Sequence, residues 1–82
     1  MQTTMIRLPK VLATTGLGRS SLYAAVKDGL FVKPVPLGPR AVGFAEHEVQ
    51  AINQAKLSGK SLTEIRELVA TLHAQRTEGV PA

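Results

Sequence analysis

The alternation of apolar and polar residues predicts two short helices joined by a tight turn. The first helix follows residue 8, the turn spans residues 15–18, and the second helix runs over residues 19–28. The apolar positions of the second helix recur every three or four residues and therefore share one face; they are Leu22, Ala25 and Val26. The turn is too short for the helices to lie antiparallel, so we expect the steep crossing of a helix-turn-helix.

The second helix has a start signal of its own. With Gly18 as the N-cap, Leu17 and Leu22 occupy the two positions that form a hydrophobic staple. This pair fixes the register and makes Arg19 the first helical residue. Gly29 suits the left-handed conformation that ends many helices.

After the second helix, apolar residues alternate over residues 31–44, with an interruption at residues 37–40. This period of two predicts a small two-stranded hairpin with its turn at the interruption. Pro34 and Pro36 cannot donate ladder hydrogen bonds, so the first strand is short, irregular or at an edge. A hairpin at this place would be the wing of a winged helix, with Arg40 at its tip.

Two further helices follow. Residues 46–57 carry glutamates in the first turn, where the helix dipole favours them, and Val49 and Ile52 on the inward face. The sequence Ser-Leu-Thr-Glu at residues 61–64 is a capping box and predicts a fourth helix over residues 61–75.

The predicted fold is mostly α with a small β-hairpin, a winged helix-turn-helix with four helices. We expect residues 1–58 to form this domain and residues 59–82 to add the last helix and a tail. Residues 1–6 and the tail beyond Gln75 have no strong pattern and are expected to be loose. The fourth helix either packs on the domain or forms a homodimer through its apolar residues Leu62, Ile65, Val69 and Leu72.

Composition restricts the possible functions. The chain has 82 residues, enough for one domain, and no cysteine. Disulfide scaffolds, cysteine-ligated zinc and cysteine nucleophiles are therefore excluded, and a reducing cytoplasm is compatible. No apolar run approaches the roughly 18 residues of a membrane span, and no signal peptide is visible. We expect a cytoplasmic protein, associated with the bacterial nucleoid if it binds DNA.

The charge is unevenly distributed. Residues 1–45 carry six Lys and Arg and one Asp, a net charge of +5, whereas residues 46–82 have a net charge of −1. The positive half coincides with the two-helix segment and the hairpin. A localised basic surface is typical of proteins that bind polyanions.

Two segments resemble a known family. The sequences R-L-P-K-V-L-A-T-T-G-L-G-R-S-S-L-Y (residues 7–23) and P-V-P-L-G-P-R-A-V-G-F (residues 34–44), followed by an acidic helix start at Glu46, are similar to the AlpA-type phage regulators. These are small winged helix-turn-helix proteins related to MerR-like and excisionase-like DNA binders. The resemblance covers residues 6–57 and implies binding of double-stranded DNA, with the recognition helix at residues 19–27.

The sequence departs from the family at several positions. Gly18 stands where a hydroxyl cap is usual, and Phe44 replaces a tryptophan. Ala24 and Pro36 stand where basic residues are common, which removes two phosphate contacts. A second subunit would recover the affinity that these positions lose.

The candidate DNA contacts are Arg19, Ser20, Ser21, Tyr23, Lys27, Lys33 and Arg40. At a helix start, Arg19 can bind guanine O6 and N7. The two serines can bind phosphate or cap the helix locally. Tyr23 combines core packing with a phosphate contact, and Lys27 suits the DNA backbone.

The two remaining cations are predicted on the hairpin. Arg40 could enter an adjacent minor groove, whose negative potential attracts arginine. Lys33 is expected on a solvated strand face, which we favour over a DNA contact.

Nothing in the sequence indicates catalysis. His47 and His73 stand alone, without the further ligands that a metal site requires. No catalytic triad or phosphate-cradling glycine motif is present, so we expect neither an enzyme nor a cofactor. Three interpretations remain: a transcriptional regulator, an excisionase-like factor that bends DNA, and a protein–protein adaptor acting through the helix at residues 61–75.

Overall fold

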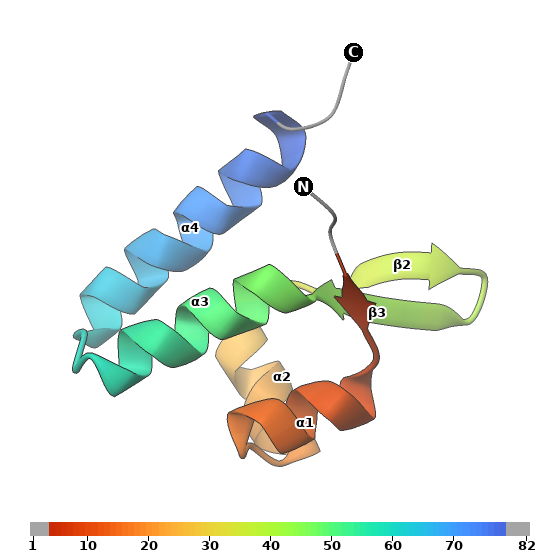
Figure 1. Cartoon of the computed structure of the whole chain (residues 1–82), viewed down its shortest axis with the longest axis horizontal. Coiled ribbons are helices and arrows are strands. Elements are labelled where there is room, and N and C mark those ends of the chain that lie inside the picture. The colour runs from red at the N-terminus through yellow and green to blue at the C-terminus, as the bar shows by residue number, and fades with distance from the viewer. Residues whose placement is uncertain (1–3, 79–82) are drawn as a thin grey trace.

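A computed structural model describes residues 4–78 of the chain (Figure 1). Its elements are, in chain order, β1 (Met5–Ile6), α1 (Leu8–Thr15), α2 (Arg19–Lys27), β2 (Val35–Gly38), β3 (Ala41–Ala45), α3 (Glu46–Leu57) and α4 (Leu62–Glu78). The three strands form one antiparallel sheet in the order β1-β3-β2. The predicted winged helix-turn-helix with four helices is confirmed.

The helix-turn-helix has the predicted register. Gly16 ends α1 in the left-handed region, with φ at 74°. Gly18 is the extended N-cap of α2, and Arg19 is its first residue. Leu17 is partly buried against the core cluster that contains the fully buried Leu22. Figure 1 shows α1 and α2 running in steeply different directions.

The end of α2 is also the predicted one. Gly29 has a φ of 77°, a conformation that side chains other than glycine rarely adopt. Its N–H donates to the Val26 carbonyl oxygen at 3.2 Å, and the Leu30 N–H donates to the Ala25 carbonyl oxygen at 2.8 Å. This pair of bonds is a Schellman motif, which satisfies the last carbonyl groups of the helix.

The sheet has one strand more than predicted. Met5 and Ile6 form β1, opposite Ala45 and Phe44 of β3. The prediction of a loose segment was therefore wrong at these two positions; residues 1–3 lie outside the described range. A two-residue strand is too short to show alternation, and its pairing partner lies about 40 residues away.

The wing is the predicted hairpin, with a shorter first strand. β2 begins only at Val35, so the alternation that appeared to start at Phe31 does not continue as a strand. Phe31 and Val32 are instead fully buried in the core, where the Phe31 ring meets Phe44 edge-on at 5.8 Å. β2 is at the sheet edge, and its pairing is irregular after Pro36, which agrees with the missing proline donor.

A close approach holds the three strands together at Gly43. A Cβ atom at this position would lie 2.6 Å from Leu37 Cδ1 and 3.1 Å from the Ile6 carbonyl oxygen. Both distances are shorter than ordinary van der Waals contact, so a side chain here would require the Leu37 side chain to move and the Ile6 backbone to shift by a few tenths of an ångström.

α4 belongs to the same core as the other elements. Its Ile65, Val69 and Leu72 are 3–6% exposed and pack in one cluster with residues of α1, α2, α3 and the sheet. Three of the four residues considered for a homodimer are thus buried within the chain, and only Leu62, at 59%, is exposed. No helix in residues 4–78 is long and apolar enough to cross a membrane.

The predicted start of α4 agrees with the structure, but its predicted end does not. The Ser61 N–H donates to Glu64 Oε1 at 3.1 Å and the Glu64 N–H donates to Ser61 Oγ at 3.2 Å, which confirms the capping box. The bond from the Ser61 N–H to the carboxylate, together with the Lys60 ammonium, lowers the pKa of Glu64. The predicted end of the helix at Gln75 was wrong, because α4 continues to Glu78.

Candidate nucleic-acid interface

The exposed face of α2 carries five of the predicted contact residues. All five are solvent-exposed, while Leu22, on the opposite side of the helix, is fully buried; they are Arg19, Ser20, Ser21, Tyr23 and Lys27. The helix period alone accounts for this division, because residues on one face cannot reach the other. Arg19, Ser20, Tyr23 and Lys27 therefore share the exposed side of α2, whereas Ser21 is exposed at the border of that side, next to Ala25.

Ser20 and Ser21 were expected either to bind phosphate or to cap α2 locally, and the described part of the chain shows no local capping. Gly18 provides no side-chain cap, and within residues 4–78 neither Ser20 nor Ser21 makes a hydrogen bond through its hydroxyl. Local capping by these hydroxyls is thus not observed. Their donors and acceptors remain available to a ligand at the start of α2.

Arg40 lies where the hairpin turns. The turn residues Pro39 and Arg40 connect β2 to β3 and are exposed. Two apolar side chains of the hairpin, Leu37 and Val42, are 43% and 39% exposed. The wing therefore carries one exposed cation, Arg40, in its turn, next to two strands with partly exposed apolar side chains.

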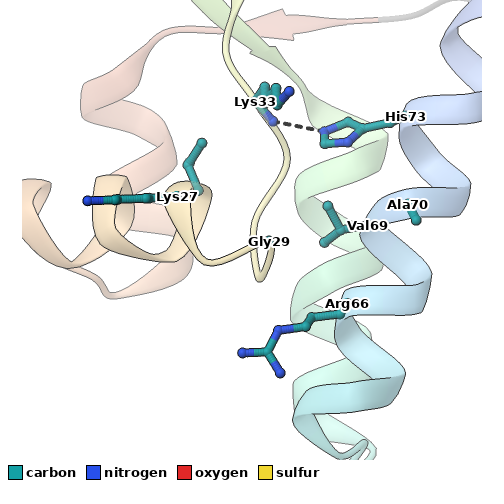
Figure 2. A pocket seen from close by; sticks show the side chains of 8 residues that line it. Lys27, Gly29, Lys33, Arg66, Val69, Ala70 and His73 are labelled. Atoms are coloured by element: carbon teal, nitrogen blue, oxygen red, sulfur yellow. Dashed lines mark hydrogen bonds between the residues drawn. The ribbon is translucent and has the colours of Figure 1, made fainter.

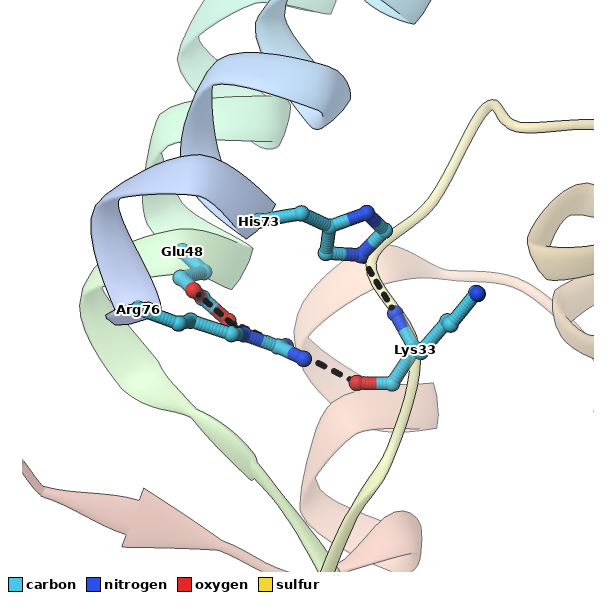
Figure 3. Close-up of polar contacts among 4 residues, drawn as sticks. All are labelled: Lys33, Glu48, His73 and Arg76. Carbon is cyan, nitrogen blue, oxygen red and sulfur yellow. Dashed lines mark hydrogen bonds and ion pairs between the residues drawn. The ribbon is translucent and has the colours of Figure 1, made fainter. Parts of the chain in front are cut away.

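Lys33 does not lie on a strand, contrary to the prediction. It belongs to the segment between α2 and β2, and its side chain is exposed. Its backbone is bound to α4: the Lys33 N–H donates to His73 Nε2 at 3.1 Å (Figure 2). Its carbonyl oxygen accepts a hydrogen bond from Arg76 Nη2 at 2.8 Å (Figure 3).

The same arginine forms an ion pair with Glu48 of α3. Arg76 Nη2 is 2.6 Å from Glu48 Oε1, and Arg76 Nε is 2.9 Å from Oε2. Glu48 is 1% exposed, so the pair satisfies a carboxylate that is otherwise removed from water. The sequence does not reveal this pair, because 28 residues separate its members and the helix dipole alone accounts for a glutamate in the first turn.

His73 is a part of this cluster rather than an isolated surface residue. Its Nε2 accepts a hydrogen bond, which requires the neutral ring. Burial lowers the pKa of His73, and the nearby Arg76 and Lys33 cations lower it further, while Glu48 acts in the opposite direction. No group of three or more residues within 4–78 has the composition of a metal site.

The cations predicted to contact DNA form no salt bridge within residues 4–78, and the same holds for Arg7, Lys56 and Arg66. The salt bridges among residues 4–78 join Lys10 to Glu46, Lys60 to Glu64 and Arg76 to Glu48. None of them includes Arg19, Lys27, Lys33 or Arg40. The basic side chains of α2 and the wing are thus exposed without a carboxylate partner in the described range, which leaves their charge available to a polyanion.

Comparisons with known proteins agree with this geometry. The family described as "Prophage CP4-57 regulatory protein (AlpA)" matches residues 4–57, which extend from the start of the sheet to the end of α3. A protein of Enterobacteria phage P4, described as "Uncharacterized protein ORF88", is 32% identical over 59 residues, which cover 72% of this chain and 67% of the phage protein. No solved structure matches the chain.

Proposed function

Because the chain belongs to the AlpA family of prophage regulatory proteins, we propose that it is a transcriptional regulator that binds specific DNA sequences. α2 would enter the major groove, and the wing would lie against the neighbouring backbone or minor groove. One observation supports this most strongly: the cations of α2 and the wing turn are exposed and unpaired within residues 4–78 of a winged helix-turn-helix.

The side chains divide into two roles under this proposal. Arg19, at the first helical position, reads a base edge through its guanidinium, since helix starts reach the groove floor first. Ser20, Ser21, Tyr23 and Lys27 bind the phosphate backbone and set the position of the helix. Arg40 adds a contact at the wing tip, where a narrow minor groove attracts arginine.

The structure leaves little exposed apolar surface on α4 for a protein–protein adaptor. It requires an apolar stripe along α4, but Ile65, Val69 and Leu72 are in the core of the chain. Only Leu62 of that stripe is exposed, and a single leucine does not provide a protein–protein interface.

Selection of DNA from a random pool tests the proposal. We expect a preferred sequence, with an affinity that falls by a log–log slope of about −0.9 for each phosphate neutralised as salt rises. Direct or inverted repetition in the selected sites would show that two copies bind. If no sequence is preferred over bulk DNA, the proposal fails.

A separate experiment tests whether the protein regulates transcription or bends DNA at the selected site. We expect the protein to change transcription from a promoter that carries the site. Bending is measured by the gel mobility of the complex on DNA fragments of equal length that carry the selected site at different positions. A regulator that does not bend DNA gives the same mobility at every position. Strong bending without an effect on transcription would contradict the regulator and support the excisionase-like alternative.

A further inference from the structure

A pocket of about 300 Å³ lies between the C-terminal end of α2 and the middle of α4 (Figure 2). Its polar side chains come from Lys27 at the end of α2, Lys33 in the following segment, and Arg66 and His73 on α4. No carboxylate lines it. The pocket is open to solvent and is therefore accessible to a large ligand as well as to a small ion.

Arg66 is directed from α4 toward the end of α2 (Figure 2). Its Nε donates to the Asp28 carbonyl oxygen at 3.2 Å, which fixes the guanidinium in this position. A guanidinium has five N–H donors, so four remain after this bond. Within residues 4–78 they form no hydrogen bond, and Arg66 makes no ion pair.

The pocket continues the exposed face of α2. Lys27 lines the pocket at the end of α2 and directs its ammonium away from it, whereas Lys33 and Arg66 extend the positive charge toward α4 (Figure 2). Figure 2 shows Lys33 near His73 at one end and Arg66 at the other, with Gly29 between them. The small Gly29 leaves space for a ligand to approach the backbone at the helix end.

We propose that Arg66 and Lys33 each bind a phosphate group of the DNA backbone beside the base pairs that α2 reads. The interface then extends from α2 onto α4, and the last helix contacts DNA in addition to completing the core. The inference rests on the proposed function, because it requires DNA along the exposed face of α2. A phosphate of that DNA fits better than a free anion, since the pocket is open and shares Lys27 with the exposed face.

The salt dependence of binding to the selected DNA tests this inference. Arg66→Gln and Lys33→Gln should each weaken all duplex sequences alike and reduce the magnitude of the log–log salt slope by about 1. The affinity lost between 50 mM and 200 mM salt would then be about fourfold smaller than in the wild type. Lys56→Gln is the matched control, because Lys56 is exposed on α3 outside the pocket and should leave the slope unchanged.

Two precautions keep the outcome interpretable. Arg66→Gln removes the bond to Asp28, so its unfolding transition must be compared with that of the wild type. Lys33→Gln changes no bond of the Lys33 backbone to α4 and tests the pocket even if the Arg66 variant unfolds. An unchanged slope in a folded Arg66 variant and in Lys33→Gln, or an equal reduction in Lys56→Gln, would overturn the inference.

A free anion is distinguished by a titration with inorganic phosphate at constant ionic strength. Saturable shifts of the pocket amides in NMR spectra, combined with unchanged DNA slopes in both variants, would overturn the inference in favour of a free-anion site. If the wild type selects a DNA sequence but the slopes do not change, only this inference fails. If the wild type selects no sequence, the proposed function fails first.

Discussion

The cations of α2 and Arg76 of α4 have opposite surroundings. Arg19 and Lys27 on α2 are exposed and have no carboxylate partner within residues 4–78. The Arg76 side chain on α4 is 28% exposed, and its guanidinium binds the buried carboxylate of Glu48. An exposed charge retains its hydration, whereas a buried charge requires a partner. The surroundings of each charged residue, rather than its type, therefore separate the proposed interface from its support, the cluster of Arg76, His73 and Glu48.

The support acts on the segment that connects the two parts of the interface. Arg76 and His73 bind the carbonyl and N–H groups of Lys33, which lies between α2 and β2. α4 thereby binds the segment in which the chain leaves α2 and leads to the wing (Figure 3). The segment between α2 and the wing is thus bound to a helix outside the region that matches the family, which ends at residue 57.

The largest expected effect comes from removing the partner of the buried carboxylate. Arg76→Ala leaves Glu48 without its ion pair and should lower the free energy of unfolding by about 3 kcal/mol, at the low end for a broken buried pair because Arg76 is partly exposed. Denaturant unfolding followed by circular dichroism measures this change.

An exposed pair at the start of the same helix, with Lys60 in the preceding turn, provides the control. Lys60 and Glu64 are 3.7 Å apart and about half exposed, so Lys60→Ala should cost less than about 1 kcal/mol. If the two variants lose the same free energy, burial does not distinguish the two groups of cations, and the comparison fails.

A smaller effect, on specificity rather than on stability, is expected at the start of α2. Arg19→Ala should lose about 1–3 kcal/mol of discrimination between the selected DNA and a scrambled duplex. Its unfolding transition should match that of the wild type, because Arg19 makes no intramolecular ion pair among the described residues. Fluorescence anisotropy with both duplexes gives the ratio of affinities. An unchanged ratio would show that α2 is not placed in the groove as proposed.

The next effect separates phosphate binding from base reading on the same helix. Lys27→Ala should weaken the selected and scrambled duplexes by the same factor and reduce the magnitude of the salt slope by about 1. The two duplexes are measured over a series of salt concentrations, with Arg19→Ala in parallel. A loss confined to the selected duplex would assign Lys27 to base contacts instead.

The sequence predicted those parts of the fold that depend on neighbours along the chain. The Leu17–Leu22 staple placed the start of α2 at Arg19, and the Ser61–Glu64 capping box placed the start of α4. Each signal lies within a few residues of the feature that it determines. The exposed face of α2 followed from the same local register.

Features that depend on distant partners were missed or misplaced. β1 exists because β3 pairs with it, and the end of α4 lies beyond Gln75, where Arg76 meets Glu48. Lys33 fits a strand by alternation, but its backbone binds His73 and Arg76 about 40 residues later. Hydrophobic periodicity contains no information about such pairings, so the bonds between α4 and the segment before the wing required the structure.

The smallest effect concerns the pH dependence of the support. Burial and the Arg76 and Lys33 cations hold the pKa of His73 below its usual value of 6.5, against the opposing effect of Glu48. Because the unfolded chain binds the proton more readily, the contribution of neutral His73 to stability is fully present above pH 6.5. It decreases as pH falls from 6.5 to the lowered pKa in the folded state and changes no further below it.

Unfolding of the wild type and of His73→Gln at pH 7.5, 6.5 and 5.5 measures this contribution as the difference between the two proteins. We expect that difference to move against the wild type as pH falls, because protonated Nε2 can no longer accept the Lys33 N–H. The exposed side chains of α2 remain charged in contact with water, whereas the surroundings of His73 on α4 should disfavour the protonated ring. A wild type that gains stability relative to His73→Gln at pH 5.5 would mean that the folded support accepts an additional charge, and burial would then not be what distinguishes α4 from α2.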